Sequence, residues 1–122
     1  MEQTDEAEVP QRTPDVASTL YIARAKGRAV TESDSLADLA SFVSEPDSIV
    51  WIDLTDPSAE LIGAISRELG IHQLVVEDIV DTDGRAKLVE VDGLLHMVLF
   101  GLTRDRALEL HEVDFVIGRQ FL

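Results

Sequence analysis

The sequence predicts an α/β fold in which α-helices pack on the faces of a mixed parallel and antiparallel β-sheet. Three observations lead to this prediction. Apolar residues repeat with helical spacing in several segments, and other segments show the apolar runs typical of strands. Helices alternate with strands early in the chain, and hairpins dominate late. The chain has 122 residues, 45% of them hydrophobic, which is enough for one domain with a real core.

The chain is strongly acidic, with 24 Asp and Glu residues against 10 Lys and Arg, and a net charge of −14. Nucleic-acid binding needs a basic surface that releases phosphate counterions, so no nucleic-acid partner is expected. An anionic membrane surface would also repel the chain. Cations and basic partners fit this charge, although solubility alone also explains an acidic surface.

The sequence excludes some chemistry and indicates a soluble, intracellular chain. It contains no cysteine, so disulfides and thiolate chemistry are excluded. No signal peptide is recognised at the N-terminus. The longest nearly apolar run, residues 94–102, is far shorter than the roughly 20 residues that cross a bilayer. No nucleophile elbow, P-loop or dinucleotide fingerprint is present, so we do not expect an enzyme.

Residues 1–17 are predicted to form a disordered acidic tail ahead of one domain at residues 18–122. The tail has five acidic residues, one arginine, two prolines and little to bury. Residues 20–23 and 28–31 are predicted to be short strands joined by a turn at Lys26-Gly27.

A helix, a strand and a second helix are expected next. Ser33 or Ser35 can cap the first helix. Its apolar face is formed by residues at helical spacing, Leu36, Leu39, Ala40 and Val43. The apolar run 49–54 fits a strand buried on both faces, which would place Trp51 in the core. Asp56 is predicted to cap the second helix, with Pro57 as its first helical residue, and Gly70 to end it. Its buried stripe is predicted to be Leu61, Ile62, Ile65 and Leu69.

The second half is predicted to contain one helix and three strands. The helix spans residues 72–80, and strands at 87–91 and 94–102 are joined by an Asp92-Gly93 turn. Residues 108–117 form the last predicted strand. Its side chains expected near the buried side are Leu110, Val113, Phe115 and Ile117.

Two adjacent carboxylates, Glu77 and Asp78, lie on the helix predicted at 72–80. Neighbouring helical residues differ by about 100° in direction, so this pair is expected near the rim of the buried face. A hard cation such as Mg²⁺ takes oxygen ligands, keeps most of its waters and needs only one or two carboxylates. Spacing alone, however, favours an ordinary solvated acidic face.

Two other metal motifs can be set aside. Asp81, Asp83 and Glu90 fall at positions 3, 5 and 12 of a calcium-binding loop, but position 1 would be Ile79, which cannot ligate. We therefore interpret Asp83-Gly84 as a turn. The three histidines lack the helical spacing of a zinc motif, and residues 111–114 are expected at an edge or a solvent face.

The segment 70–87, GIHQLVVEDIVDTDGRAK, resembles the Gly-Ile-His-Pro-Leu-x-x-Glu-Asp-Ile-Leu…Arg-Pro-Lys signature of the cytoplasmic domain of CorA-type magnesium channels. The resemblance extends over residues 49–122, through WIDL at 51–54, VDFVI at 113–117 and QFL at 120–122. Gln73 and Ala86 replace the two prolines of the signature, which removes backbone stiffening at both positions.

The resemblance implies a regulatory, ion-sensing domain of a CorA-like channel for Mg²⁺ or another divalent cation. This domain would lie at the cytoplasmic face of the cell membrane, attached only through C-terminal helices outside this chain. Asp78 and Glu77 would help to build metal sites between subunits of a homopentamer, with Asp78 the stronger candidate. Arg85 and Lys87 would form supporting ion pairs or fix the strand entry, and a plain surface ion pair is equally compatible.

Two alternatives to the magnesium-channel interpretation stay open at this point. One is a domain of a related zinc transporter, which would share the fold but not the ion. The other is a free-standing acidic module that binds a basic protein partner.

Overall fold

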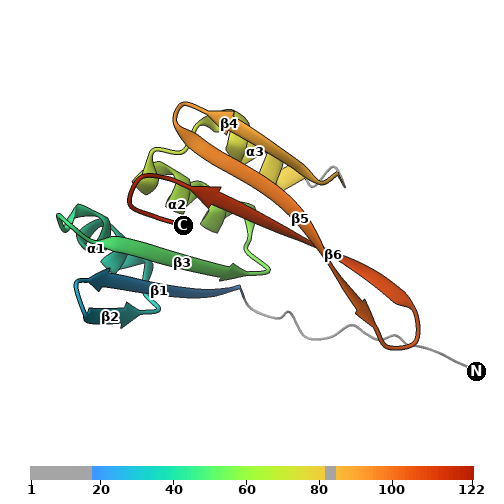
Figure 1. Ribbon diagram of the computed structural model, residues 1–122, viewed down its shortest axis with the longest axis horizontal. Helices are drawn as coiled ribbons and strands as arrows, with labels where there is room; N and C mark the ends of the chain where they lie inside the picture. The colour runs from blue at the N-terminus through green and yellow to red at the C-terminus, as the bar shows by residue number, and fades with distance from the viewer. Residues whose placement is uncertain (1–17, 82–84) are drawn as a thin grey trace, which may run out of the picture.

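The computed structural model describes residues 18–81 and 85–122 (Figure 1). The predicted tail at 1–17 and the predicted Asp83-Gly84 turn lie outside the described residues. The elements in chain order are β1 (Thr19–Lys26), β2 (Ala29–Ser33), a 3₁₀ helix (Leu36–Asp38), α1 (Leu39–Ser44), β3 (Ile49–Thr55), α2 (Ala59–Leu69), α3 (Gln73–Asp81), β4 (Lys87–Val91), β5 (Leu94–Arg104) and β6 (Leu108–Ile117).

The strands form two antiparallel sheets of three strands each, in the orders β2-β1-β3 and β4-β5-β6. The α/β class is as predicted, but the mixed parallel and antiparallel sheet is not confirmed, because both sheets are antiparallel. Tight turns join β1 to β2 and β4 to β5, and a short loop joins β5 to β6, so these neighbours run antiparallel. The helices α2 and α3 connect one sheet to the other instead of linking parallel neighbours. Within the described residues, parallel pairing is confined to one bridge between Val50 and Phe121.

Both predicted turn pairs lie where the strands reverse. The first turn places Gly27 at φ 60°, beyond the paired residues Lys26 and Ala29. The second places Asp92 at φ 53° and Gly93 at φ 80°. A type I′ hairpin turn needs positive φ at both central residues, and its twist matches that of the strands. The Asp92-Gly93 pair therefore fixes the register of β4 against β5.

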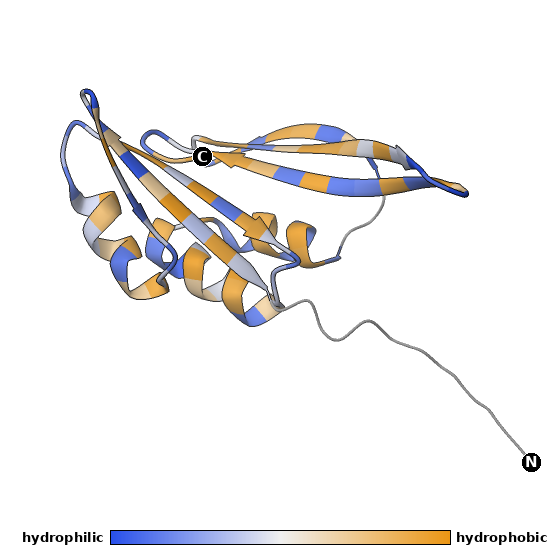
Figure 2. Ribbon diagram, turned by 90° about the horizontal axis from the view of Figure 1, so that it is seen from below, coloured by the Kyte–Doolittle hydropathy of each residue, from blue (hydrophilic) through white to orange (hydrophobic). Residues whose placement is uncertain are grey.

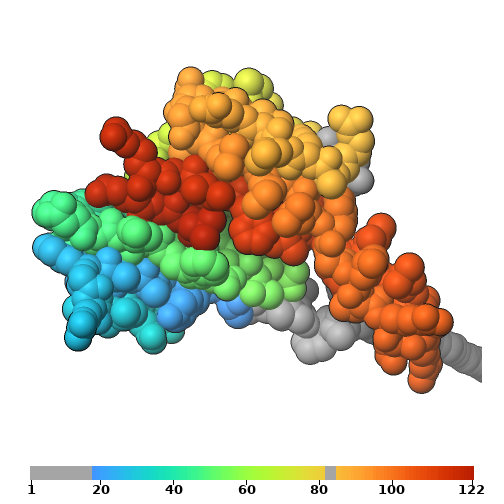
Figure 3. Space-filling model, viewed as in Figure 1, coloured from blue at the N-terminus to red at the C-terminus, as the bar shows by residue number. Residues whose placement is uncertain are grey.

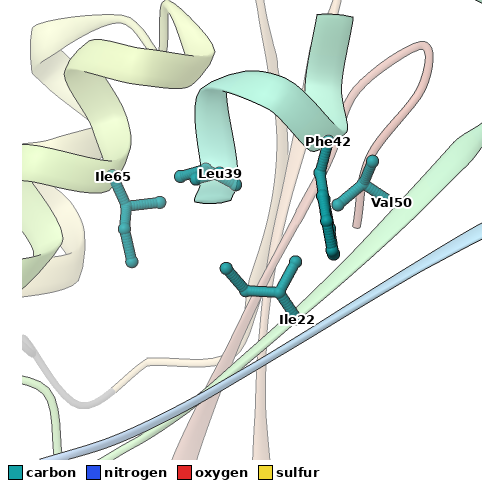
Figure 4. Close-up of a cluster of buried hydrophobic side chains, with 5 residues drawn as sticks. All are labelled: Ile22, Leu39, Phe42, Val50 and Ile65. Atoms are coloured by element: carbon teal, nitrogen blue, oxygen red, sulfur yellow. The ribbon is translucent and has the colours of Figure 1, made fainter. Parts of the chain in front are cut away.

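Within the described chain, α1, α2 and α3 all lie on the same side of the sheets (Figure 2). The core lies between this helical layer and the sheet β2-β1-β3 (Figure 4). Its central side chains are Ile22, Leu39, Phe42, Val50 and Ile65. Burying an aliphatic side chain of this size contributes about 1.5–3 kcal/mol. This apolar cluster is therefore the main source of stability for the first sheet.

The strand β3 is buried on one face only, which corrects the prediction for residues 49–54. Val50 is fully buried, whereas Ile49 is 64% exposed and Trp51 is 45% exposed. The reason is the one-sided helical layer: in the described residues, no helix covers the sheet face that carries Ile49 and Trp51. Trp51 is therefore not a core residue in this structure.

The helix boundaries are set by caps that the sequence predicted only in part. Ser35 accepts a hydrogen bond from Ala37 N–H at the start of the 3₁₀ helix, as one of the two predicted caps. The α2 cap is Ser58, whose Oγ accepts the Leu61 N–H at 3.1 Å, so the prediction of Asp56 as the cap is wrong. Gly70 ends α2 in the left-handed conformation, at φ 68°, as predicted.

The last three residues join the two halves of the molecule. After β6 the chain turns back, and Gln120–Leu122 run beside the outer edge of β3. Val50 N–H donates to Gln120 O at 2.7 Å, and Ile52 N–H donates to Leu122 O at 2.8 Å. Phe121 packs against the core cluster. This segment therefore ties the sheet β4-β5-β6 to the core of the first sheet.

The far ends of β5 and β6 extend away from the rest of the molecule as a two-stranded arm (Figure 3). Three large leucines, Leu102, Leu108 and Leu110, are exposed on it. Leu110 is 66% exposed, so its predicted burial is wrong. None of the described helices is long and apolar enough to span a membrane.

Candidate functional site

The candidate acids lie on α3, which packs beneath the sheet β4-β5-β6 (Figures 1 and 2). Val75 is buried and anchors the helix. The opposite stripe of α3 is exposed and combines two large apolar side chains, Leu74 and Val80, with two acids, Glu77 and Asp81. A stripe of this kind is suited both to a protein partner and to a cation.

His72 fixes the start of α3. Leu74 N–H donates to His72 Nδ1 at 3.0 Å, and Val75 N–H donates to the His72 carbonyl oxygen at 3.0 Å. Free N–H groups at a helix start need such acceptors. The Nε2 atom of His72 lies 3.7 Å from Asp92 Oδ2 in the β4–β5 turn. His72 thus sets the position of α3, and with it the directions of Glu77 and Asp78.

Glu77 and Asp78 point in different directions, as expected for neighbours on a helix. Glu77 is exposed to solvent. Asp78 turns toward β4, where its Oδ2 lies 2.8 Å from Lys87 Nζ. The Asp78 side chain is 44% exposed and that of Lys87 is 20% exposed. One acid of the pair is therefore open to solvent, and the other is engaged by a lysine of the same chain.

The sheet places Lys87 for this contact. Lys87 is the first residue of β4 and lies directly opposite Val98 of β5, which is buried under the helical layer. The Lys87 side chain therefore projects toward α3, and its apolar stem is largely covered while its ammonium group reaches the helix surface. Arg85 lies exposed two residues ahead of β4.

The donor chemistry of this site suits a hard divalent cation. Glu77 and Asp78 offer carboxylate oxygens, and Mg²⁺ binds through one or two carboxylates while keeping several waters. No group of three or more His, Cys, Asp or Glu side chains is placed to hold a metal ion among the described residues. A shallow hollow of about 290 Å³ lies between α2 and α3, lined by Gly63, Ser66, Arg67, Ile71, Gln73 and Val76. The two candidate acids are outside this hollow.

A buried polar pair in the second sheet was missed by the sequence interpretation. His96 Nε2 lies 2.9 Å from Asp114 Oδ1, with side chains only 1% and 16% exposed. Asp114 lies opposite Val98, and Val116 lies opposite His96, so these side chains share the sheet face that α3 covers. Residues 111–114 were predicted at an edge or a solvent face. They lie in β6, which is an edge strand, but Asp114 faces the helical layer and not solvent. The alternation of His96 and Val98 in β5 was the signal that could have revealed the pair.

One comparison with known proteins identifies a family, and another shows a shared fold. Residues 46–122 match the family model described as CorA-like Mg2+ transporter protein. No curated protein sequence matches the chain. Among solved structures, the complete structure of the CorA magnesium transporter from Methanocaldococcus jannaschii is similar, with a TM-score of 0.62 and 16% sequence identity. The similarity covers 83% of this chain and 30% of that transporter, so it shows a shared fold over less than a third of the transporter's length.

Proposed function

The chain belongs to the CorA-like Mg2+ transporter family, and we propose that it acts as the regulatory, ion-sensing domain of a divalent-cation channel. The sensed ion is Mg²⁺, or another divalent cation of similar ligand preference. In the full-length protein the domain lies at the cytoplasmic face of the cell membrane and meets copies of itself in a homopentamer. Glu77 and Asp78 contribute half of a cation site between subunits, and a neighbouring subunit supplies the other half.

One observation carries this proposal: the exposed stripe of α3 presents Glu77 next to large apolar side chains, and the partly exposed Asp78 follows it on the helix. Leu74 and Val80 are exposed on either side of Glu77. Exposed apolar side chains that gather beside polar groups mark contacts with other chains. The stripe lies within the segment that matches the family model. An apolar contact with embedded acids suits an interface that closes when a cation is present.

The mechanism is electrostatic. A bound cation bridges acids of adjacent subunits and holds the ring closed, and like charges face one another when the cation leaves. A cation present at its own dissociation constant stabilises one site by about 0.4 kcal/mol, from RT ln 2. Five such sites give roughly 2 kcal/mol, which shifts a two-state equilibrium about thirtyfold. Weak individual sites can therefore gate a cooperative ring.

The proposal predicts that Asp78 controls closure of the channel by Mg²⁺. The full-length protein is reconstituted in liposomes, and ion flux is measured as Mg²⁺ is raised on the side of the domain. Asp78→Asn should raise the Mg²⁺ concentration for half-maximal closure by about tenfold, because loss of the carboxylate weakens every site and the midpoint scales with the dissociation constant of each site. Glu60→Gln is the control, because Glu60 is an exposed acid in the first turn of α2. Equal closure curves for wild type and Asp78→Asn would refute the assignment.

A further inference from the structure

The ion pair between Asp78 and Lys87 points to a role for Lys87 within the proposed site. We propose that the Lys87 ammonium group is a tethered cation that competes with Mg²⁺ for the Asp78 carboxylate. Lys87 would thereby set the Mg²⁺ concentration at which the site fills. This inference rests on the proposed function and specifies how the same site is tuned.

The geometry supports competition. Lys87 Nζ lies 2.8 Å from Asp78 Oδ2, so the ammonium group already occupies one carboxylate oxygen. A directly bound Mg²⁺ would need a distance of about 2.0–2.1 Å to an oxygen of the same small group. Two cations on one carboxylate repel each other, so binding of the metal to Asp78 favours withdrawal of the ammonium group. Asp78 stays partly exposed, which gives an ion access from solvent.

The position of Lys87 makes the exchange feasible. Its backbone is fixed in β4, paired with Val98, and most of its side chain is covered. The ammonium group lies at the end of a flexible four-carbon stem and is a strongly hydrated point charge. It can therefore leave Asp78 by rotation of the stem while β4 stays in place.

Glu77 differs from Asp78 in its contacts. Within the described residues, Glu77 has no ion pair and faces solvent, whereas Asp78 is engaged by Lys87. The two adjacent acids are therefore not equivalent toward a cation. Mg²⁺ meets an open carboxylate at Glu77 and a competitor at Asp78. A site built this way fills at a higher ion concentration than two open carboxylates would require.

The inference predicts tighter cation binding when the ammonium group is removed. A partly exposed ion pair is a weak competitor, so Lys87→Met should raise the affinity at Asp78 about threefold. Methionine keeps an unbranched apolar stem that can fill the same covered space. Lys87→Arg keeps the positive charge and should bind close to wild type.

Manganese provides the measurement, because Mn²⁺ accepts the same oxygen ligands as Mg²⁺ and broadens nearby amide signals even when binding is weak. The ¹⁵N-labelled 122-residue chain is titrated with MnCl₂, and broadening is followed at amides of residues 74–81. MgCl₂ is then added to displace the manganese.

The control is Lys26→Met, which removes an equal charge from a second lysine–carboxylate pair, Lys26 Nζ to Glu45 Oε2 at 2.6 Å. That hydrogen bond lowers the pKa of Glu45, as expected for a carboxylate engaged by an ammonium group.

The outcomes separate the two proposals. Threefold stronger broadening of α3 in Lys87→Met, absent in Lys87→Arg and Lys26→Met, supports the tethered cation. A second outcome is broadening that is lost in Asp78→Asn but is equal in wild type and Lys87→Met. This result would overturn the tethered cation and leave the proposed site intact. Broadening that is unchanged by both Asp78→Asn and Glu77→Gln would overturn the proposed site itself. Amide spectra without manganese show directly whether each variant is folded.

Discussion

Asp114→Ala should lower the free energy of unfolding by about 2–3 kcal/mol. The Asp114 carboxylate is hydrogen-bonded to Nε2 of His96. The His96 side chain is almost fully buried between the second sheet and the helical layer. Removal of the carboxylate leaves a buried ring nitrogen without its partner, and a buried polar group without a partner costs about 1–3 kcal/mol. The lost contacts of the Asp114 side chain add to this cost. A domain of this size has a total stability of about 5–15 kcal/mol, so the loss is large.

The same sheet offers a matched control. Glu109 Oε1 lies 3.7 Å from His111 Nε2, and both side chains are well exposed on the arm of β5 and β6. Glu109→Ala should therefore change the stability by less than about 0.5 kcal/mol. Urea unfolding followed by tryptophan fluorescence and circular dichroism measures both variants. A similar, small effect in both would show that burial of the His96–Asp114 pair does not govern the stability of the second sheet.

Gly118→Ala should destabilise the domain by about 2 kcal/mol and detach the C-terminal segment from β3. A Cβ at position 118 would overlap the ring of Phe121, which packs against the core and cannot move away freely. Overpacking at such a position typically costs about 1–3 kcal/mol. Gly118 N–H also donates to the Phe121 carbonyl at 2.9 Å, so displacement of Phe121 would break this turn.

Hydrogen exchange reports the detachment directly. The amides of Val50, Ile52 and Leu122 are bonded across the β3 edge, and each should exchange faster in Gly118→Ala. Gly101→Ala is the control, because its nearest neighbour would lie at an ordinary distance of 4.0 Å, from the carbonyl oxygen of His111. Unchanged exchange at Val50 and Ile52 in Gly118→Ala would contradict the role given to Phe121.

Local signals allowed much of the secondary structure to be predicted. The Asp92-Gly93 turn, the Gly70 helix end and the stripe around Ile62 and Ile65 depend on neighbouring residues alone, and each is found where expected. The α2 cap was assigned wrongly because Asp56 and Ser58 are both good caps two residues apart. The choice between them is made by the path of the chain out of β3, where Asp56 adopts φ 48°.

The arrangement of strands and layers depended on information that periodicity does not contain. An apolar run such as 49–54 predicts a strand, but not whether both faces are covered, and Trp51 was placed in the core for that reason. In β6 the prediction placed Leu110, Val113, Phe115 and Ile117 near the buried side. Leu110 and Val113 are exposed, and the helical layer covers the face of Asp114 and Val116, where Asp114 contacts His96 of β5.

The candidate site could also be predicted only in part, because local geometry is encoded in neighbouring residues and packing between elements is not. Helical geometry was enough to predict that Glu77 and Asp78 diverge. It could not show that Lys87, nine residues along the chain, engages Asp78 and not Glu77, because that contact depends on how β4 packs beside α3. The metal role of both acids stays a prediction that rests on the resemblance and, for Glu77, also on the exposed stripe of α3.

The most direct test of the intersubunit cation site uses the assembled full-length protein. Limited proteolysis at increasing Mg²⁺ concentration gives the concentration for half-maximal protection in wild type, Asp78→Asn and Glu60→Gln. A cation that bridges subunits through Asp78 should protect wild type and Glu60→Gln equally, and Asp78→Asn only at about tenfold higher Mg²⁺. Identical protection of all three proteins would show that Asp78 is not part of a cation site between subunits.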